Sequence, residues 1–208
     1  MQRRIAIDLN DVIRAYTAKF AGLYKKDIDN SFDIDNVDIF TNDLKQVFPF
    51  NSEKEYQDFV YVDYAYELFG CSEMMDKALV SKFNFWQLND LMEMDVEAPE
   101  LLFVSPFEFG LTIQSTFHFL SKFARVREVY FPSNSITIWD RCDILITANP
   151  RLIENKPEGK VSIKIEAPYN KDVYGDYNFK SFMDLMNDNT NLIQTIIQDL
   201  DKEGGEKE

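Results

Sequence analysis

Residues 4–11 of the chain, Arg-Ile-Ala-Ile-Asp-Leu-Asn-Asp, decide the fold, because a short apolar run leads directly into acidic and amide side chains. A run this short that ends in Asp8 is typical of a strand buried on both faces of a parallel sheet. Four more runs follow, at residues 101–105 (LLFVS), 128–131 (EVYF), 143–147 (DILIT) and 160–165 (KVSIKI). A helical pattern over residues 113–124 separates the second run from the third. This alternation predicts an α/β fold with a doubly wound parallel sheet.

About 90 residues separate the first two runs, which is far longer than an ordinary connection between a strand and a helix. This segment contains helical patterns at 12–24 and 74–94, and the capping-box sequence Ser52-Glu53-Lys54-Glu55. We therefore predict a helical cap over residues 15–96, inserted into a core of residues 1–14 and 97–200. A helix is expected over 179–200, and a disordered tail over 201–208. The aromatic residues of 56–69 are interpreted first as the core of the cap and second as a stacking wall for a nucleobase.

Composition excludes several classes of protein. Apolar residues make up 45% and aromatic residues 14% of the 208 residues, which is enough for a packed core. Lys and Arg number 22 against 36 Asp and Glu, and the net charge of -14 argues against binding to nucleic acid or to an anionic membrane. No apolar run approaches the length of a signal peptide or a membrane span. Cys71 and Cys142 show no metal-binding spacing, and we expect both to be buried thiols of a cytoplasmic protein.

Three strand ends carry polar residues. Asp8 ends the first run, Ser105 the second and Thr147 the fourth. In an open parallel sheet, ligands bind beyond the carboxyl ends of the strands, so we expect these residues to lie at one site. By its position just before a helical pattern, Asp11 is interpreted as a residue that stabilises the amino end of the following helix.

The late segments 143–155 (DILITANPRLIEN) and 159–170 (GKVSIKIEAPYN), together with the first strand, resemble a known family. The pattern of strand, turn with Pro, strand and closing Pro168-Tyr169-Asn170 is similar to the haloacid dehalogenase-like (HAD) superfamily. Within that superfamily it most resembles the cytosolic 5'(3')-deoxyribonucleotidases and their bacterial relatives. The resemblance covers residues 4–14 and 101–170, and it extends to the cap in position and helical character only. It implies a Rossmann-type core and phosphomonoester hydrolysis assisted by Mg²⁺.

The resemblance implies a role for each strand-end residue. Asp8 falls on the nucleophile that forms an aspartyl-phosphate, and Ser105 on the hydroxyl that binds the phosphoryl group. The remaining family positions are substituted: the acid/base by Asn10, the Lys by Asn134, and the acidic pair that holds Mg²⁺ by Thr147 and Ala148. Alternative cations for the missing Lys are Arg125, Arg127 and Arg141. We therefore expect no metal and no other cofactor.

Three hypotheses follow. The leading one is a nucleotidase-like protein with a degenerate site, non-catalytic or severely impaired, that binds a phosphorylated small molecule or nucleotide. The alternative is an active 5'-nucleotidase-type phosphatase with Asp8 as nucleophile and Asp11 as proton donor. A structural module without a ligand is the third. Whether the chain is an enzyme depends on how far the substitutions disable the site, since acid–base help alone contributes about 10² to 10⁴ in rate.

Overall fold

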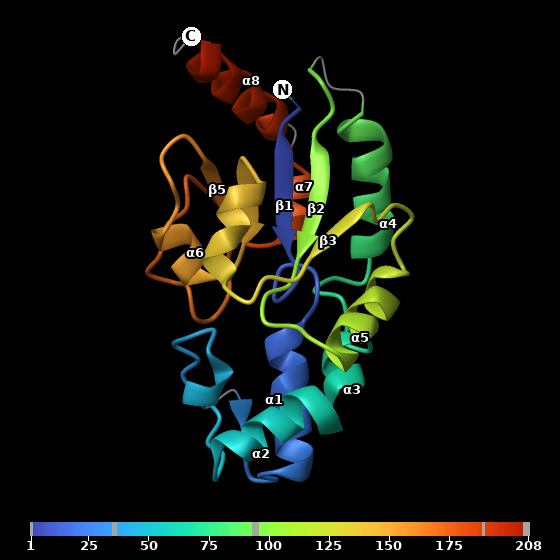
Figure 1. Cartoon of the computed structure of the whole chain (residues 1–208), viewed down its shortest axis with the longest axis vertical. Coiled ribbons are helices and arrows are strands. Elements are labelled where there is room, and N and C mark those ends of the chain that lie inside the picture. The colour runs from blue at the N-terminus through green and yellow to red at the C-terminus, as the bar shows by residue number, and fades with distance from the viewer. Residues whose placement is uncertain (1, 35–36, 93–95, 189, 206–208) are drawn as a thin grey trace.

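The computed structural model describes residues 2–34, 37–92, 96–188 and 190–205. Its centre is one sheet in which all strands are parallel (Figure 1). The strands are β1 (Arg4–Asp8), β2 (Glu100–Val104), β3 (Glu128–Tyr130), β4 (Ile144–Thr147), β5 (Val161–Ile165) and β6 (Tyr177–Phe179). Their order is β3-β2-β1-β4-β5-β6, so the strand order reverses between β1 and β4. The predicted doubly wound α/β fold is confirmed, and β6 is a strand that the sequence patterns did not predict.

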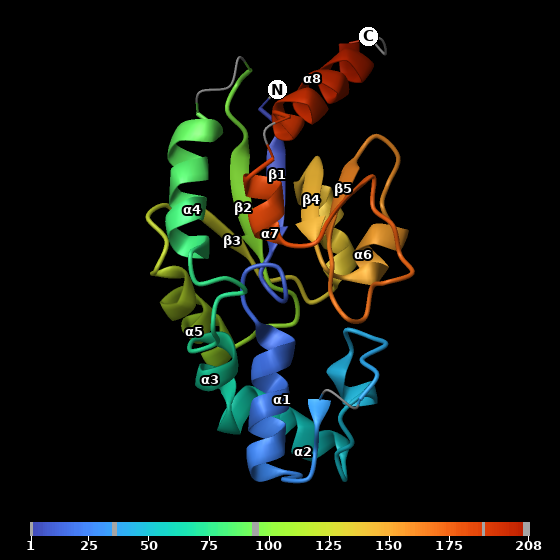
Figure 2. The ribbon, with the colours of Figure 1, turned by 180° about the vertical axis from the view of Figure 1, so that it is seen from behind.

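Alternation along the buried strands gives the sheet two apolar faces. Ile5 and Ile7 of β1 pack in the larger core cluster, whereas Ala6 packs on the other face with Trp139 and Leu152. Helix α6 (Pro150–Glu154) covers the second face, in front of the sheet in Figure 1. Helices α4 (Leu79–Phe85) and α7 (Phe182–Met186) cover the first face, as the reverse view shows (Figure 2). The sheet is therefore the middle of three layers.

Most of the inserted segment lies beyond the carboxyl ends of the strands (Figures 1 and 2). It includes α1 (Tyr16–Asp27), a 3₁₀ turn (Leu44–Gln46), α2 (Glu53–Asp58), a π turn (Phe59–Asp63) and α3 (Ala65–Phe69). Half of the predicted capping box is present, because the Ser52 hydroxyl accepts a hydrogen bond from the Glu55 N–H, while the Glu55 carboxylate accepts from the Asn51 N–H. The segment by which the chain leaves the core, residues 13–15, lies beside the segment by which it returns, residues 73–75. Ala15 N–H donates to the Glu73 carbonyl at 2.9 Å, and Met75 N–H to that of Ile13 at 2.8 Å.

Three expectations about the elements need correction. Helix α4 lies within the predicted cap range but packs on the sheet, where the Phe83 ring lies 5.6 Å from that of Phe103. The single helix expected over 179–200 is instead the end of β6, then α7 and α8 (Leu192–Gly205). The tail expected from residue 201 is helical as far as Gly205, and residues 206–208 lie outside the described chain.

Three smaller expectations can also be compared with the structure. Cys142 is buried as expected, but Cys71 is exposed, since the turn after α3 faces solvent; both thiols are free. Within the described residues, no helix combines the length and apolar character that a bilayer span requires. Helix α5 (Leu111–Leu120) begins slightly before the predicted 113–124 segment and packs mainly on α3.

Candidate functional site

A cleft of about 610 Å³ opens between the carboxyl edge of the sheet and the cap. The first loop contributes Asp8, Asn10 and Asp11 to its lining, and the loop after β4 contributes Asn149. The cleft lies next to the reversal of strand order between β1 and β4, where parallel sheets of this kind bind ligands. The structure thus brings three of the predicted site residues, Asp8, Asn10 and Asp11, to one cavity.

Asp8 is the most unusual group in the cleft, because its carboxyl group is buried and only half paired. Its Oδ2 accepts a hydrogen bond of 2.8 Å from the Thr147 hydroxyl, while its Oδ1 has no hydrogen-bond partner among the described residues. Burial, reinforced by the neighbouring Asp11, raises the pKa of Asp8 to about 7. The Thr147 hydroxyl, the Asn10 N–H and Arg14 oppose this shift without cancelling it. Asp8 therefore titrates near neutrality.

Asp11 is fully engaged in holding the structure together. It adopts a left-handed backbone with φ 58°, a conformation that Asp tolerates better than most residues. Its Oδ1 accepts from the Thr17 N–H at 2.9 Å, and its Oδ2 accepts from the Thr17 hydroxyl at 2.6 Å and the Tyr169 hydroxyl at 2.8 Å. Burial raises the pKa of Asp11, and these hydrogen bonds oppose that shift. Because the residue before α1, Ala15, has no capping side chain, Asp11 serves as its cap.

Asn10 and Ser105 are both held by a residue that the sequence analysis missed, Arg14. The Asn10 Oδ1 accepts from Arg14 Nε at 2.9 Å and from Nη2 at 2.6 Å. The Ser105 hydroxyl accepts from Arg14 Nη2 at 3.0 Å and itself donates to Glu108. Ser105 is fully buried, and it is absent from the described lining of the cleft. The hydroxyl expected to bind a phosphoryl group instead faces the protein interior.

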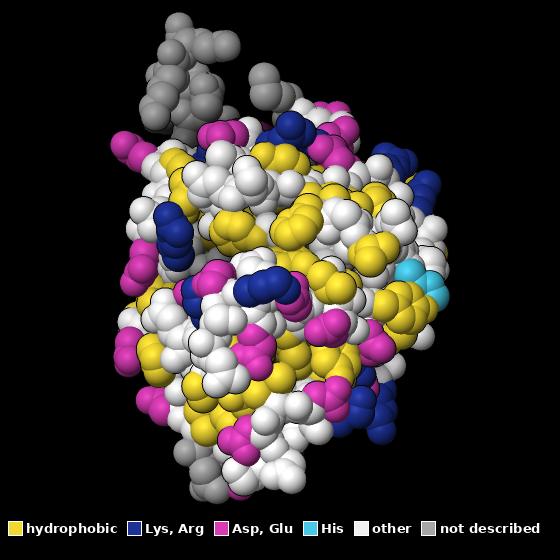
Figure 3. Space-filling view, turned by 60° about the horizontal axis from the view of Figure 1, so that its bottom comes forward, with side chains coloured by type: hydrophobic (Ala, Val, Ile, Leu, Met, Phe, Trp, Pro, Cys, Tyr) yellow, Lys and Arg dark blue, Asp and Glu magenta, His cyan; other side chains and the backbone are white. Residues whose placement is uncertain are grey.

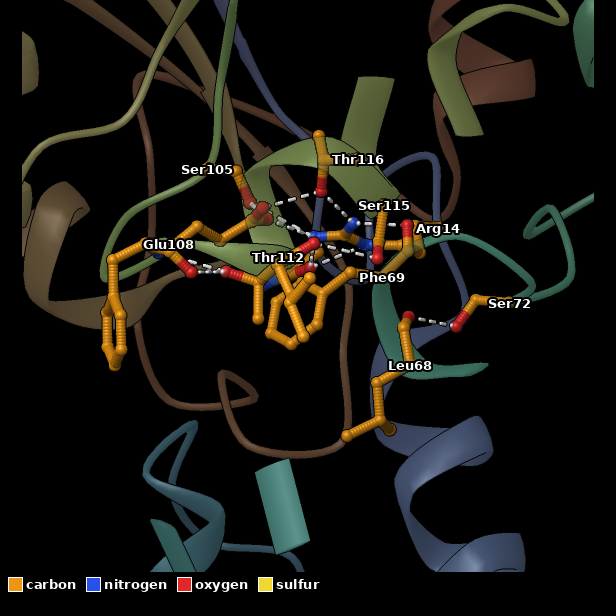
Figure 4. Close-up of polar contacts among 12 residues, drawn as sticks. Arg14, Leu68, Phe69, Ser72, Ser105, Glu108, Thr112, Ser115 and Thr116 are labelled. Carbon is orange, nitrogen blue, oxygen red and sulfur yellow. Dashed lines mark hydrogen bonds and ion pairs between the residues drawn. The ribbon is translucent and has the colours of Figure 1, made fainter. Parts of the chain in front are cut away.

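Arg14 is the centre of a buried ionic network (Figure 4). Its side chain is fully buried, as is that of Glu108, with which Nη2 forms an ion pair at 2.9 Å. Nη1 donates to the carbonyl of Phe69 at the end of α3 and to the Thr116 hydroxyl on α5. Together with the contacts to Asn10 and Ser105, these bonds use all three guanidinium nitrogens. A guanidinium carries five N–H donors, so none remains for a ligand.

The positions of the expected Lys and of the metal ligands carry other contacts. Asn134 is exposed and caps the 3₁₀ helix Ser135–Arg141, its Oδ1 accepting from the Ile136 N–H at 3.2 Å. Thr147 uses its hydroxyl on Asp8 and also accepts from the Asn149 N–H. The buried methyl of Ala148 offers no ligand atom. Within the described part of the chain, no group of three or more His, Cys, Asp or Glu side chains is placed to hold a metal ion. These residues do not fit Mg²⁺, which is bound through carboxylates, phosphates and water.

Several residues of the cleft were not predicted from the sequence. Ser135, at the start of the 3₁₀ helix Ser135–Arg141, and Arg151 and Glu154 of α6 line it. Among the described residues the Arg151 guanidinium has no hydrogen-bond or ion-pair partner. Asn170, part of the predicted closing triplet, donates to the carbonyls of Ala148 and Ile165 at 2.8 Å each and so ties two loops together. In the sequence, the one signal for the ionic network was an Arg within the otherwise apolar and aromatic segment 12–16.

Aromatic and acidic side chains make up much of the cleft wall that the cap provides. Tyr56 and Tyr61 line the cleft, whereas Phe59 is buried in the core of the cap. The interpretation as a cap core therefore holds for Phe59, and the stacking wall for a nucleobase stays a prediction. Asp43 lines the cleft as well. Figure 3, which brings the cap end forward, shows acidic side chains scattered among hydrophobic ones on this face. Arg151 is the single basic residue among the described lining residues.

Comparisons with known proteins identify the fold and leave the finer class open. No protein-family model matches the chain, and no curated protein sequence matches it. Among solved structures, the chain is similar to a haloacid dehalogenase-like hydrolase from Burkholderia xenovorans LB400, with a TM-score of 0.58 and 7% identity over 92% of this chain and 98% of that one. It is also similar to a HAD-superfamily hydrolase of subfamily IA from Geobacter sulfurreducens, with a TM-score of 0.52 and 12% identity over 89% and 95% of the two chains. The fold is HAD-like.

The HAD-like fold agrees with the resemblance of the first and late segments, whereas the closer likeness to nucleotidases stays a prediction. At 7% and 12% identity, the likeness carries the fold and not the reaction. The function must therefore be argued from the site itself.

The first prediction concerns Asp8. Because burial raises its pKa from 3.8 to about 7, the folded state favours the protonated form, and stability falls as the pH rises between these values. Asp8→Asn mimics the protonated form. We expect the variant to gain stability over the wild type, and the gain to be about 2 kcal/mol larger at pH 8 than at pH 5.5, since one pKa unit corresponds to about 1.4 kcal/mol.

Urea unfolding at the two pH values measures this difference. Asp38→Asn, an exposed carboxylate on the cap, is the matched control and should show no such trend. A gain for Asp8→Asn that does not change with pH would contradict the assigned titration.

The second prediction concerns the charge balance around Arg14. Glu108→Gln leaves a buried guanidinium without its counter-ion and should cost about 3–5 kcal/mol of unfolding free energy. Asn10→Asp supplies a new carboxylate at a position that already contacts Arg14. We expect the double variant to recover about 1–3 kcal/mol relative to the sum of the two single effects.

A double-mutant cycle measured by chemical denaturation tests this coupling. Asn10→Asp combined with Glu154→Gln, which lies outside the network, should be additive. Additivity in both cycles would show that Asn10 and Glu108 do not share the charge of Arg14.

Proposed function

We propose that this chain is a HAD-like protein of nucleotidase-type architecture that binds a phosphorylated small molecule, with hydrolysis lost or severely impaired. The proposal places it in the cytoplasm, in agreement with two free thiols. The observation that carries it is the engagement of Asn10 and Ser105 by Arg14. These are the positions to which the family resemblance assigns proton transfer and phosphoryl binding.

The chemistry that remains supports binding better than turnover. Asp8 keeps the position of the nucleophile at the end of β1 and is among the residues that line the cleft. Asn10 has an amide where an acid would protonate the leaving group, and an amide does not exchange a proton at neutral pH. The loss of such a group typically costs about 10² to 10⁴ in rate. The absent metal-ligand carboxylates remove charge stabilisation in addition.

The phosphate of such a ligand has one favourable anchor. Arg151 lies in the cleft lining with its guanidinium unpaired among the described residues, and Ser135 lines the same side. An Arg guanidinium binds phosphate through charge-assisted hydrogen bonds, so we assign the phosphate to this end of the cleft. This differs from the expected location at Ser105, whose hydroxyl is occupied.

The alternative, an active phosphatase with Asp11 as proton donor, is less well supported. Both oxygens of Asp11 already accept hydrogen bonds from Thr17 and Tyr169. To donate a proton to a leaving group, Asp11 would have to give up the capping of α1. The φ of 58° holds its side chain in this arrangement.

Phosphate release tests the loss of hydrolysis. We expect the wild type to release no more phosphate from a panel of deoxyribonucleoside monophosphates than Asp8→Asn does, with or without Mg²⁺. The physical reason is the lack of a proton donor and of a metal site. Turnover that depends on Mg²⁺ and disappears in Asp8→Asn would instead support the active phosphatase.

Binding tests the ligand class. Isothermal titration with deoxyadenosine monophosphate should show an affinity for the wild type that Arg151→Gln lowers about tenfold, the expected loss for one partly exposed charge-assisted hydrogen bond. Arg127→Gln removes an equal charge next to the amino end of β3, whereas the cleft lies at the carboxyl ends of the strands. This variant should leave the affinity unchanged. Equal loss in both variants would indicate only a general charge effect.

A further inference from the structure

Helix α5 has an outer face that is unusually apolar for a surface in contact with water. Its sequence over Leu111–Leu120, LTIQSTFHFL, contains no Lys, Arg, Asp or Glu, although 28% of the chain is charged. On the inner face, Thr116 and Phe119 are fully buried. On the outer face, Leu111 and Phe117 are 59% and 52% exposed. A helix that is apolar on both faces is normally covered on both, so the outer face of α5 lacks a partner.

Residues of the cap extend this apolar surface. Helix α3 packs on α5, and the two helices lie side by side at the edge of the molecule in both views (Figures 1 and 2). A hollow of about 270 Å³ between the cap and α5 is lined by Val62, Tyr66 and Leu111, among others. The Phe109 ring continues the surface, since it stacks on the ring of Tyr61, the residue before Val62, with 4.5 Å between the centroids. Together these exposed side chains form what we call the α5 patch: Val62, Tyr66, Phe109, Leu111 and Phe117.

The area of the α5 patch matches the apolar part of a dimer interface. Its members are between 49% and 64% exposed. They therefore present about 100 Å² each and about 500 Å² together. The largest apolar patch on a typical monomer covers about 300–600 Å² and is often functional. A stable interface buries about 800 Å² per partner, of which roughly 60% is apolar, so the patch and a polar rim supply what one side of a dimer needs.

The charges around the patch fit a second copy of the same chain. Asp63 and Glu67 line the hollow beside the amino-terminal half of α5, and neither forms an ion pair among the described residues. Lys122 is exposed just beyond the carboxyl end of α5, where its ammonium group lies 4.6 Å from the centroid of the Phe119 ring. Two copies with a net charge of -14 each repel one another unless opposite charges meet at the contact. An antiparallel pair of α5 helices brings such charges together.

We propose that the α5 patch is the interface of a homodimer, in which the α5 helices of two copies pack antiparallel about a two-fold axis. Each contact of such an interface occurs twice. Phe117 of one copy fills the hollow of the other, and Lys122 of each copy lies near Asp63 of the other. The inference is independent of the proposed function, because the residues of the α5 patch are absent from the described lining of the cleft.

Sedimentation equilibrium of the full chain, without any ligand, tests the dimer. We expect the wild type at micromolar concentration to have twice the mass of one chain. Phe117→Glu should weaken the association about a hundredfold, because each copy loses a buried aromatic side chain and gains a carboxylate. Phe85→Glu is the matched control, since Phe85 is an equally exposed aromatic residue of α4 at 54% and lies outside the patch. The dimer of this control variant should be unchanged, and circular dichroism checks that both variants are folded.

A charge exchange tests the antiparallel arrangement. Lys122→Glu and Asp63→Lys should each weaken the dimer several-fold at low ionic strength, whereas the double variant should recover most of the loss, because the exchanged charges meet across the interface. A double variant as weak as the two single effects predict together would overturn this packing. A wild type that stays monomeric, or a dimer that Phe85→Glu weakens more than Phe117→Glu, would overturn the interface. Sedimentation of a monomeric wild type with phosphatidylcholine vesicles would show that lipid, not a second copy, covers the patch.

Discussion

A guanidinium without solvent contact must satisfy its donors within the protein, and Arg14 does so by joining parts of the chain that are far apart. It contacts the loop after β1, the loop after β2, the end of α3 and the middle of α5 through Asn10, Ser105, Phe69 and Thr116. Glu108 neutralises it. Because α3 belongs to the inserted segment and the other partners to the core, the hydrogen bond from Arg14 to the Phe69 carbonyl joins the cap to the core. It lies beside the backbone hydrogen bonds between residues 13–15 and 73–75.

This arrangement gives a physical reason for the Asn at position 10. A buried ion pair is balanced when one carboxylate meets one guanidinium, and a second carboxylate on Arg14 would add an uncompensated charge. Glu108 already provides the single negative charge, so a neutral amide that accepts two hydrogen bonds suits position 10. The Asp11 conformation follows the same logic: a residue at φ 58° would usually be Gly, but the carboxylate caps α1 in return.

The layered sheet could be predicted from the sequence because each buried strand is an apolar run of a few residues. Asp8 marked the carboxyl edge of the sheet, where the cleft lies. β6 escaped because Tyr177–Phe179 is a short edge strand with an exposed Asn, which leaves no run to detect. The actual orientation of Ser105 could not be predicted. It depends on Arg14, 91 positions away, and on Glu108, and contacts between residues so distant in sequence leave no local pattern. The same holds for Asp11 and Tyr169, which are 158 positions apart.

A HAD-like fold fixes where a ligand lies more firmly than what happens to it. The end of β4 carries Thr147 and Ala148 and no carboxylate, so this strand end offers no negative charge to a metal ion. Asp8 is buried at the end of β1, and one of its oxygens has no hydrogen-bond partner among the described residues. Thr147 can donate one proton and no positive charge. Burial outweighs the Thr147 hydroxyl, the Asn10 N–H and Arg14, and so raises the pKa of Asp8 to about 7. Asp8 therefore changes its charge near neutral pH, which distinguishes it from an ordinary carboxylate that is ionised throughout this range.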